Sequence, residues 1–426
     1  MLITNTAYLN ENYDIEIGKT IQIENDRIIR IANNDQFDGF DTEIMDGSDL
    51  LFMPGLIDSH LHIGQQLLKG KVLDAKGIIW QNIMLPFEST LDERKMALNA
   101  KLAALEMIHA GTTSFIDAGS YHMESACEIL AQSGLRGAVS YSTMDDDTLP
   151  ESICETAKDA LNKTNQLYDC WHNVGNLKVF YSLRSLLSVS KECIEMISQE
   201  AINRKAMLQV HMNEYEKEVD TIIKQTGMRP YEYLASLNCL NERFIGAHSL
   251  LLDEHEMQLL IEHDCKVVHC PFSNSGKSLP NTPELIKKGV VVALGSDGAA
   301  HGGLSLWNEM RILRCMMNVT HGLNQGNRSI MPAKDLLKMA TENGAKLLQE
   351  PNLGKIKEGY LADMIAIDLS SSHLCWSHNY TNTLVECVNE GDIIHSMVNG
   401  KWIMKDRKVL TIDEEAILNE VRGFNK

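Results

Sequence analysis

Eight short apolar runs, each followed by a segment with helical periodicity, divide residues 54 to 354. The runs are GLIDSHLH up to His62, TSFID up to Asp117, RGAVSYS up to Ser142, LKVFYSL up to Leu183, MLQVHM up to Met212, FIGAHS up to Ser249, KVVHCP up to Pro271 and VVALGSD up to Asp297. Strands that alternate with helices indicate a parallel sheet with crossover connections. Eight such units predict an α/β fold, a (β/α)8 TIM-like barrel. A doubly wound open sheet is the alternative, but no glycine-rich phosphate loop follows the first run.

The segment after the first run shows how the helices are expected to begin and end. Thr90 and Glu93 form a capping-box pattern, which predicts a helix start at this point. Apolar residues then recur at helical spacing from Leu98 to Ile108. Gly111 follows them and is expected to end the helix.

The two ends of the chain have a different residue pattern from the middle. Residues 1–53 contain alternating, β-branched stretches such as TIQIENDRIIRIA, and similar stretches return in residues 355–426, where Asn399-Gly400 is a tight-hairpin signal. We expect these two segments to form one small β-sandwich domain together. Residues 54–354 then form the barrel.

Charge and hydropathy restrict the partners and the location. The chain carries 39 basic and 58 acidic residues, a formal charge of −19, which repels phosphate backbones and anionic lipid surfaces. Neither nucleic acid nor membrane is an expected partner. The first residues, MLITNTAYLN, lack a basic leader followed by an apolar run, and no stretch approaches the roughly 20 apolar residues needed to span a bilayer. We therefore expect a cytoplasmic protein that acts on a small molecule.

Ionisable residues mark the ends of several predicted strands. His60 and His62 end the first run, and residues two apart on a strand point the same way. His211, His248 and Asp297 end the fifth, sixth and eighth runs. Reactive groups of barrel enzymes gather at this edge, and this mixture of ligands suits zinc or iron. Each residue alone would more often be a hydrogen-bonded structural residue, so the prediction rests on the set.

The sequence resembles the amidohydrolase superfamily, in the branch of cytosine, adenosine and S-adenosylhomocysteine deaminases that also holds triazine hydrolases. The matching stretches are PGLIDSHLH at 54–62, HMNE at 211–214, AHS at 247–249, HCPFSN at 269–274 and LGSDGAA at 294–300, and the similarity extends over essentially the whole chain. The resemblance implies that His60, His62, His211 and Asp297 hold one metal ion, Zn²⁺ or alternatively Fe²⁺. It further implies that Glu214 and His248 act on the substrate and that the protein is a homodimer.

Some members of the superfamily use two metal ions bridged by a carboxylated lysine at the end of the fourth strand. Here Lys178 lies at the start of that predicted strand, and Ser182 and Arg184 occupy its end. One metal ion per chain is therefore expected. Zinc would activate a water molecule, Asp297 would accept its proton, Glu214 would protonate a ring or imine nitrogen and His248 would stabilise the developing oxyanion, so that ammonia leaves.

Four further residues are candidates for substrate binding. Gln65 borders the metal motif and either binds substrate or caps a loop. Trp80 is an aromatic wall or a packing residue, and His269 is a substrate contact or a buried structural histidine. Arg184 either binds a substrate carboxylate with its planar fork or pairs with a loop carboxylate.

The substrate class has competing readings. Nucleoside deaminases of this branch usually carry an acidic residue two positions before the tryptophan, where this chain has Ile78. The segments SLRSLLSVSKE at 182–192 and RPYEYL at 229–234 are similar to formiminoglutamate deiminase, whereas GSDGAAHGG at 295–303 is similar to the nucleobase and nucleoside branch. We predict a deaminase of amino-heterocycles of purine, pyrimidine, triazine or nucleoside type. The alternatives are a formimino or amidine deiminase, a dechlorinating hydrolase, and a catalytically silent scaffold of the same fold.

Overall fold

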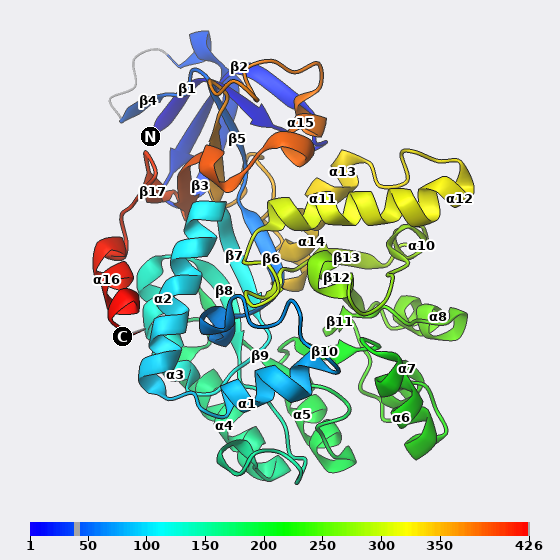
Figure 1. Cartoon of the computed structure of the whole chain (residues 1–426). Helices are drawn as coiled ribbons and strands as arrows, with labels where there is room; N and C mark the ends of the chain where they lie inside the picture. Colours follow the sequence, from blue (N-terminus) through cyan, green and yellow to red (C-terminus); the bar gives the residue numbers. More distant parts are fainter. Residues whose placement is uncertain (38–42, 425–426) are drawn as a thin grey trace.

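Two β-sheets organise the residues that this computed structural model describes, 1–37 and 43–424. One is a parallel sheet that curls into the barrel, and the other is built from both ends of the chain (Figure 1). The predicted α/β fold, a TIM-like barrel with a small β unit contributed by the chain ends, is confirmed. The exact division into 1–53 plus 355–426 and 54–354 stays a prediction, and residues 38–42 and 425–426 lie outside the described residues.

The barrel strands follow one another in sequence order around the sheet. They are β6 (Leu56–His62), β7 (Thr112–Asp117), β8 (Arg136–Ser140), β9 (Leu177–Leu183), β10 (Leu208–Met212), β11 (Phe244–His248), β12 (Lys266–His269) and β13 (Val291–Leu294). A short strand beyond β13, β14 (Asp297–Gly298), pairs in parallel with β6. The eighth predicted run therefore closes the barrel in two pieces, and its end at Asp297 lies beside the first strand.

Helices cover the outside of the barrel and leave the strands buried on both faces, as parallel strands require. Their bounds are α1 (Leu85–Glu88), α2 (Glu93–Ala110), α3 (Met123–Ser133), α4 (Ala157–Trp171), α5 (Lys191–Asn203), α6 (Glu216–Thr226), α7 (Pro230–Ser236), α8 (Glu254–Glu262), α9 (Pro271–Asn274), α10 (Thr282–Lys287), α11 (Leu306–Met317), α12 (Leu323–Gln325), α13 (Ala333–Met339) and α14 (Glu342–Leu347). A π-helical turn, Trp80–Met84, precedes α1.

The second helix begins at a different cap from the predicted one. The Asp92 side chain accepts from the Lys95 N–H at 2.7 Å, whereas the Thr90 hydroxyl donates to the Phe87 carbonyl. The predicted Thr90–Glu93 capping box is therefore wrong. The C-terminal prediction is confirmed, since Gly111 ends α2 in the left-handed region at φ 79°.

The other sheet joins the two ends of the chain in the order β18-β17-β16-β15-β5-β1-β2-β3, with β4 beside β1. Its strands are β1 (Leu2–Leu9), β2 (Ile15–Glu24), β3 (Arg27–Asn33), β4 (Ile44–Asp46), β5 (Leu50–Pro54), β15 (Met364–Asp368), β16 (Ile393–Val398), β17 (Lys401–Lys405) and β18 (Lys408–Val409). The predicted hairpin at Asn399-Gly400 joins β16 to β17, with positive φ at both turn residues.

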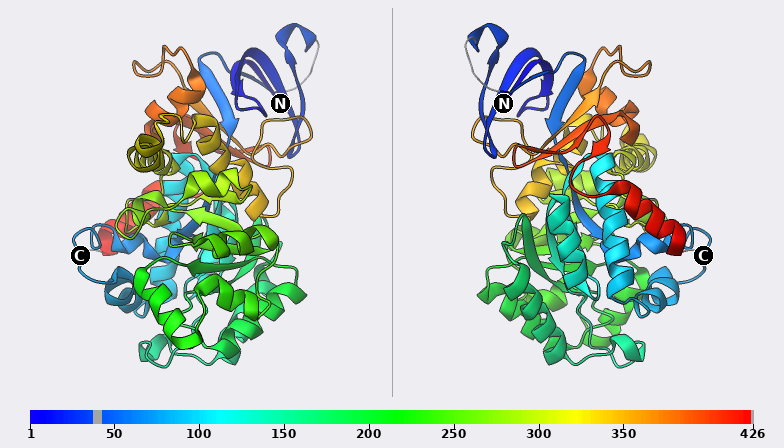
Figure 2. Two further views of the ribbon diagram at one scale, coloured as in Figure 1. Left: turned by 90° about the vertical axis from the view of Figure 1, so that its right-hand side faces the viewer. Right: turned by 90° about the vertical axis from the view of Figure 1, so that its left-hand side faces the viewer.

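Two helices complete the C-terminal part of the chain, α15 (Tyr380–Cys387) and α16 (Glu414–Phe424). The C-terminal α16 lies against α2 (Figure 2), where Lys101 pairs with Glu420 at 2.7 Å. Among the described helices, none combines the length and the apolar composition needed to cross a membrane.

Candidate metal and catalytic site

Five side chains converge at the carboxyl ends of the barrel strands. They come from β6 (His60, His62), β10 (His211), β11 (His248) and β14 (Asp297). Ligand-capable atoms of His60, His62 and His211 lie within 4.8 Å of one another, and so do those of His60, His248 and Asp297. The fold thus brings together all four residues that the sequence assigned to a metal ion, with His248 beside them.

The chemical state of these side chains fits a cation. His62 Nε2 lies 3.2 Å from His211 Nε2 and 3.4 Å from Asp297 Oδ1, so lone pairs and negative charge face one small volume. Both ring nitrogens of His60 are buried without a hydrogen-bond partner in the described part of the chain. Burial lowers the pKa of His60 to about 3 and the pKa of His62 and His211 well below the ordinary value, which leaves neutral imidazoles. Neutral imidazole is the form that binds metal, so the chain has a site that fits a metal ion.

Strained backbone conformations at the strand ends orient these side chains toward the site. His248 and Asp297 have φ of 68° and 61°, and Asn213 and Ser249, which follow β10 and β11, have φ of 50° and 49°. Non-glycine residues in this region cost free energy and persist where the surrounding structure imposes them, often at functional sites. The strain turns the chain sharply at the barrel mouth.

The first strand and the loop before Asp297 are held together by Asp58. Its carboxylate accepts from the Ser296 N–H at 3.0 Å and from the Ser296 hydroxyl at 2.5 Å. The backbone at Gly298 lies close to the Gln65 side chain, which requires glycine, because a Cβ at this position would lie 1.8 Å from Gln65 Oε1. These contacts fix Asp297 against the histidines of β6.

Two further groups lie beside the cluster as the sequence predicted. His248 Nε2 is 3.5 Å from Glu214 Oε1 and 4.0 Å from Asp297 Oδ2. The side-chain amide of Asn274 can take an orientation in which its NH2 donates to His248 Nδ1 at 2.9 Å. In the same orientation the NH2 also donates to the Cys270 carbonyl, and the amide oxygen accepts from the Cys270 N–H. The bond to His248 makes Nδ1 an acceptor, so the proton of a neutral His248 sits on Nε2 and points toward the site.

Lys277 is a site residue that the sequence analysis missed. It is 5% exposed, and its Nζ lies 2.5 Å from Glu214 Oε1, 3.4 Å from Asp297 Oδ2 and 2.5 Å from Ser273 Oγ. The residue lies three positions beyond the recognised HCPFSN stretch. No local pattern in the sequence marked it as buried, since charged residues are mostly solvated.

Two predicted substrate contacts meet at a carboxylate that was also missed. Glu88 Oε1 accepts from Gln65 Nε2 at 2.8 Å and from Arg184 Nη2 at 3.0 Å, and Glu88 and Arg184 are each 2% exposed. This ion pair is the contact expected if Arg184 has a carboxylate partner within the protein. Gln65 Oε1 and Arg184 Nη1 have no partner among the described residues.

The remaining two candidates differ in their surroundings. His269, at the end of β12, bonds through Nδ1 to the Thr282 hydroxyl at 2.9 Å, and its buried Nε2 has no partner in the described chain. Trp80 is half-buried and lines the catalytic pocket. Lys178, at the other end of its strand, bonds to the Leu348 carbonyl at 2.8 Å and pairs with Glu350 at 2.7 Å.

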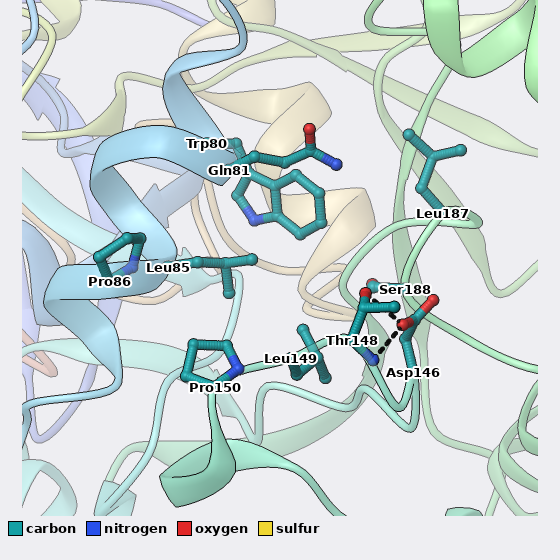
Figure 3. Close-up of a pocket in the computed structure, with 10 residues that line it drawn as sticks. All are labelled: Trp80, Gln81, Leu85, Pro86, Asp146, Thr148, Leu149, Pro150, Leu187 and Ser188. Atoms are coloured by element: carbon teal, nitrogen blue, oxygen red, sulfur yellow. Dashed lines mark hydrogen bonds between the residues drawn. The ribbon is translucent and has the colours of Figure 1, made fainter.

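Two adjoining cavities open at this end of the barrel. The catalytic pocket offers about 20 Å³, space for roughly one water molecule, and is lined by Ile78, Trp80, Arg184, Ser185, Leu187, His211, Glu214, Tyr215 and Glu218. A second cavity of about 380 Å³, which we call the outer cavity, shares Trp80 and Leu187 with it (Figure 3). A ring substrate therefore needs movement of the wall between the two.

Comparison with known proteins gives sequence relatives along the whole chain. A family model described as "Amidohydrolase family" matches residues 51–403. A 5-methylthioadenosine/S-adenosylhomocysteine deaminase from Pyrococcus horikoshii is 31% identical over 95% of this chain and 94% of that protein. A 5'-deoxyadenosine deaminase from Methanosphaera stadtmanae is 30% identical over 99% of this chain and 97% of its own length.

Solved structures with the same fold are more distant in sequence. A zinc-bound adenosine deaminase from Xanthomonas campestris superposes with a TM-score of 0.93 at 22% identity, over 100% of this chain and 97% of the other. A zinc complex of atrazine chlorohydrolase from Arthrobacter aurescens gives a TM-score of 0.91 at 19% identity, over 100% of both chains. The family model and the deaminase relatives confirm the prediction of a metal-dependent hydrolase of carbon–nitrogen bonds. This chain belongs to the amidohydrolase family.

Proposed function

We propose that this protein is a zinc-dependent deaminase that replaces the ring amino group of an adenosine-type compound with oxygen and releases ammonia. The observation that carries the proposal is the buried cluster of His60, His62, His211 and Asp297, with Glu214 and His248 at its edge. The names of the relatives, which include 5'-deoxyadenosine deaminase, support the leaving group and the substrate class.

In this proposal one Zn²⁺ per chain is held by His60, His62, His211 and Asp297. The unpartnered ring nitrogens of His60 and the neutral state of the three imidazoles support this assignment. Iron is the alternative ion, since the same ligands suit it. When bound, such an ion supplies Lewis-acid activation of a water molecule at neutral pH.

Side chains of the protein carry out the proton transfers. Glu214 takes one proton from the attacking water and delivers it to the ring nitrogen next to the reacting carbon, because it lines the catalytic pocket and its Oε1 lies 3.5 Å from His248 Nε2. His248 Nε2–H donates to the oxygen that adds to this carbon and stabilises its charge. Asp297 takes the second proton of the water from the oxygen that has added to this carbon. Breakage of the carbon–nitrogen bond, with transfer of the proton held by Asp297 to the leaving amine, then gives ammonia and the oxo product.

The remaining site residues position the substrate. Gln65 and Arg184 are both tied to Glu88, so we propose that they form the polar floor of the pocket. Trp80 is proposed as its movable aromatic wall, and the free Nε2 of His269 as a substrate contact. The acidic charge of the chain argues against nucleic-acid and membrane partners, and we further propose a cytoplasmic protein and, by analogy with the family, a homodimer.

The test is an assay of the purified, zinc-loaded protein. Ammonia release is measured with 5'-deoxyadenosine, adenosine, adenine, cytosine, an aminotriazine and a formimino amino acid, and chloride release is measured with a chlorotriazine. Ammonia from the adenosine compounds at the highest kcat/KM supports the proposal. Faster turnover of the formimino compound or the chlorotriazine would assign one of the alternative activities, and no turnover of any substrate would favour a silent scaffold.

A further inference from the structure

The outer cavity lies against the catalytic pocket, and the two share the side chains of Trp80 and Leu187. Its volume of about 380 Å³ falls within the range of roughly 300–1,000 Å³ typical of small-molecule sites. Figure 3 shows its walls converging from Trp80–Pro86, the loop Asp146–Pro150 and Leu187–Ser188. A substrate whose amino group reaches Glu214 would place its remote part here.

Apolar and uncharged polar residues make up nearly all of the described lining of the outer cavity. Its apolar members are Trp80, Leu85, Pro86, Leu149, Pro150 and Leu187, and its uncharged polar members are Gln81, Thr148 and Ser188. Among the described residues that line it, Asp146 is the one that carries a charge. No described lysine, arginine or histidine lines the cavity, so a bound anion would find no ionic partner among these residues.

The Asp146 carboxylate is held in place by its own loop. Oδ1 accepts from the Thr148 N–H at 2.7 Å and from the Thr148 hydroxyl at 2.5 Å, bonds that Figure 3 draws. Within the described residues, Oδ2 takes part in no hydrogen bond or ion pair. The preceding Asp145 accepts from the Ser190 N–H at 2.6 Å and from its hydroxyl at 2.5 Å, which anchors the loop to the start of α5. The negative charge therefore stays at the cavity wall.

The nearest cation in the adjoining pocket does not offset this charge. Arg184 lines the catalytic pocket and pairs with Glu88 at 3.0 Å, so the two form a neutral unit. A carboxylate or phosphate in the outer cavity would lose its hydration and face Asp146. A hydroxyl or an apolar group meets no such penalty, and a hydroxyl can donate to Asp146 Oδ2.

We propose that the outer cavity is the subsite for the part of the substrate remote from its amino group, and that it selects uncharged substituents and rejects anionic ones. The inference rests on the proposed deaminase function and narrows its substrate class. The compounds that fit are nucleosides with hydroxyl, methyl or thioether groups. Nucleotides and nucleosides with a 5'-carboxylate are excluded.

The kinetic test compares 5'-methylthioadenosine with AMP and adenosine 5'-carboxylate on the zinc-loaded protein. For the wild type, we expect kcat/KM for the neutral compound to exceed that for each anion by tenfold or more, since like charges oppose binding. Asp146→Lys should reduce this ratio by about tenfold or more through a lower KM for the anions. Asp146→Asn removes the charge while keeping an acceptor oxygen for Thr148, and should move the ratio in the same direction by a smaller factor.

Asp147→Asn is the matched control, because Asp147 is exposed, adjoins Asp146 and does not line the cavity. It should leave the ratio within about twofold of wild type. A wild-type ratio near one, an unchanged ratio in both Asp146 variants, or an equal shift in the Asp147 variant would overturn the inference.

A binding measurement distinguishes a failure of this inference from a failure of the proposed function. Calorimetric titration with 5'-methylthioadenosine and with AMP is run on the wild type and the same three variants, without any need for turnover. Tighter binding of the neutral compound, with the difference reduced in both Asp146 variants, supports the subsite even if no ammonia is released. Equal binding of both compounds, or binding of neither, overturns it.

Discussion

The ammonium group of Lys277 lies 2.5 Å from the Glu214 carboxylate in the interior of the site, where both side chains are largely buried. The same ammonium is 3.4 Å from Asp297 Oδ2, so one cation joins the proposed proton donor to the proposed metal ligand. Burial would raise the pKa of Glu214, but the neighbouring imidazole of His248 and ammonium of Lys277 outweigh it and lower that pKa. Glu214 therefore rests ionised and must gain a proton during the reaction.

Removal of this cation should destabilise the fold in a pH-dependent way. Glu214 has a lowered folded pKa, so its ionised form contributes stability above the ordinary carboxyl pKa, and this is lost as pH falls through the folded value. Without Lys277, two buried carboxylates lack their partner. We expect Lys277→Met to reduce the free energy of unfolding of the metal-free protein by about 3 kcal/mol at pH 7.5. At pH 4.5 the loss should be smaller, because protonation relieves the uncompensated charge. Urea unfolding at both pH values measures this.

Lys287→Met provides the matched control, since Lys287 is 78% exposed and belongs to the neighbouring α10. Its effect should stay within about 0.5 kcal/mol at either pH. If the Lys277 variant lost the same free energy at pH 7.5 and pH 4.5, the pairing with Glu214 would not be the source of its stabilisation.

Metal content should depend on His211. The wild type should bind one zinc ion per chain, and His211→Ala should bind less than about a tenth as tightly, since one of three nitrogen ligands is lost. His255→Ala is the control, because His255 is 63% exposed and pairs with Glu232 outside the site. Elemental analysis and competition with a chelator measure both. Two zinc ions per chain at full activity, or unchanged affinity in the His211 variant, would contradict the assignment.

The proposed proton transfer predicts a separation of metal binding from rate. Glu214→Gln should keep the zinc ion and lower kcat by about a hundredfold or more, because an amide cannot deliver a proton. Glu216→Gln, an exposed neighbour in the first turn of α6, should stay near wild type. Ammonia release and zinc content are measured on the same samples. Turnover of Glu214→Gln within a few-fold of wild type would remove Glu214 from the mechanism.

Periodicity and strand-end position were enough to predict the barrel and the gathering of ionisable side chains at one of its edges, whereas the choice of metal ligands came from the family resemblance. Parallel strands end on one edge, so His60, His62, His211 and His248 were placed together before any contact was known. The predicted ends overshot for some strands: β11 stops at His248 rather than Ser249, and β13 stops at Leu294. At the end of β11, His248 and Ser249 lie in the left-handed region, and pattern alone does not reveal such a turn.

Contacts between distant segments were the part that the sequence could not supply. Lys277 and Glu88 had no local signal of burial, because charged residues are mostly solvated, and each is buried by a partner far along the chain. The helix cap was missed for another reason. Asp92 and Thr90 are both good capping residues, and the structure shows that the Asp92 carboxylate accepts the hydrogen bond from the Lys95 N–H.

The role of Arg184 can be decided by a paired kinetic comparison. Its guanidinium already pairs with Glu88 at 3.0 Å in a site where both side chains are 2% exposed, so the pair offers no net positive charge to a substrate carboxylate. We therefore expect Arg184→Lys to change kcat/KM for 5'-methylthioadenosine and for adenosine 5'-carboxylate by the same factor. The expected factor is about tenfold, because a lysine cannot reproduce the planar geometry that faces Glu88.

Glu88→Gln serves as the companion variant, since it removes the other half of the pair and should give a similar, substrate-independent loss. Arg243→Lys, whose arginine pairs with Glu242 at the surface, controls for the substitution itself and should have little effect. A rise in KM of tenfold or more for the carboxylate compound alone in Arg184→Lys would show instead that Arg184 binds the substrate anion through its unpartnered Nη1. That result would also contradict the inference that the outer cavity selects uncharged substituents, so this one measurement tests both the role of Arg184 and the outer-cavity inference.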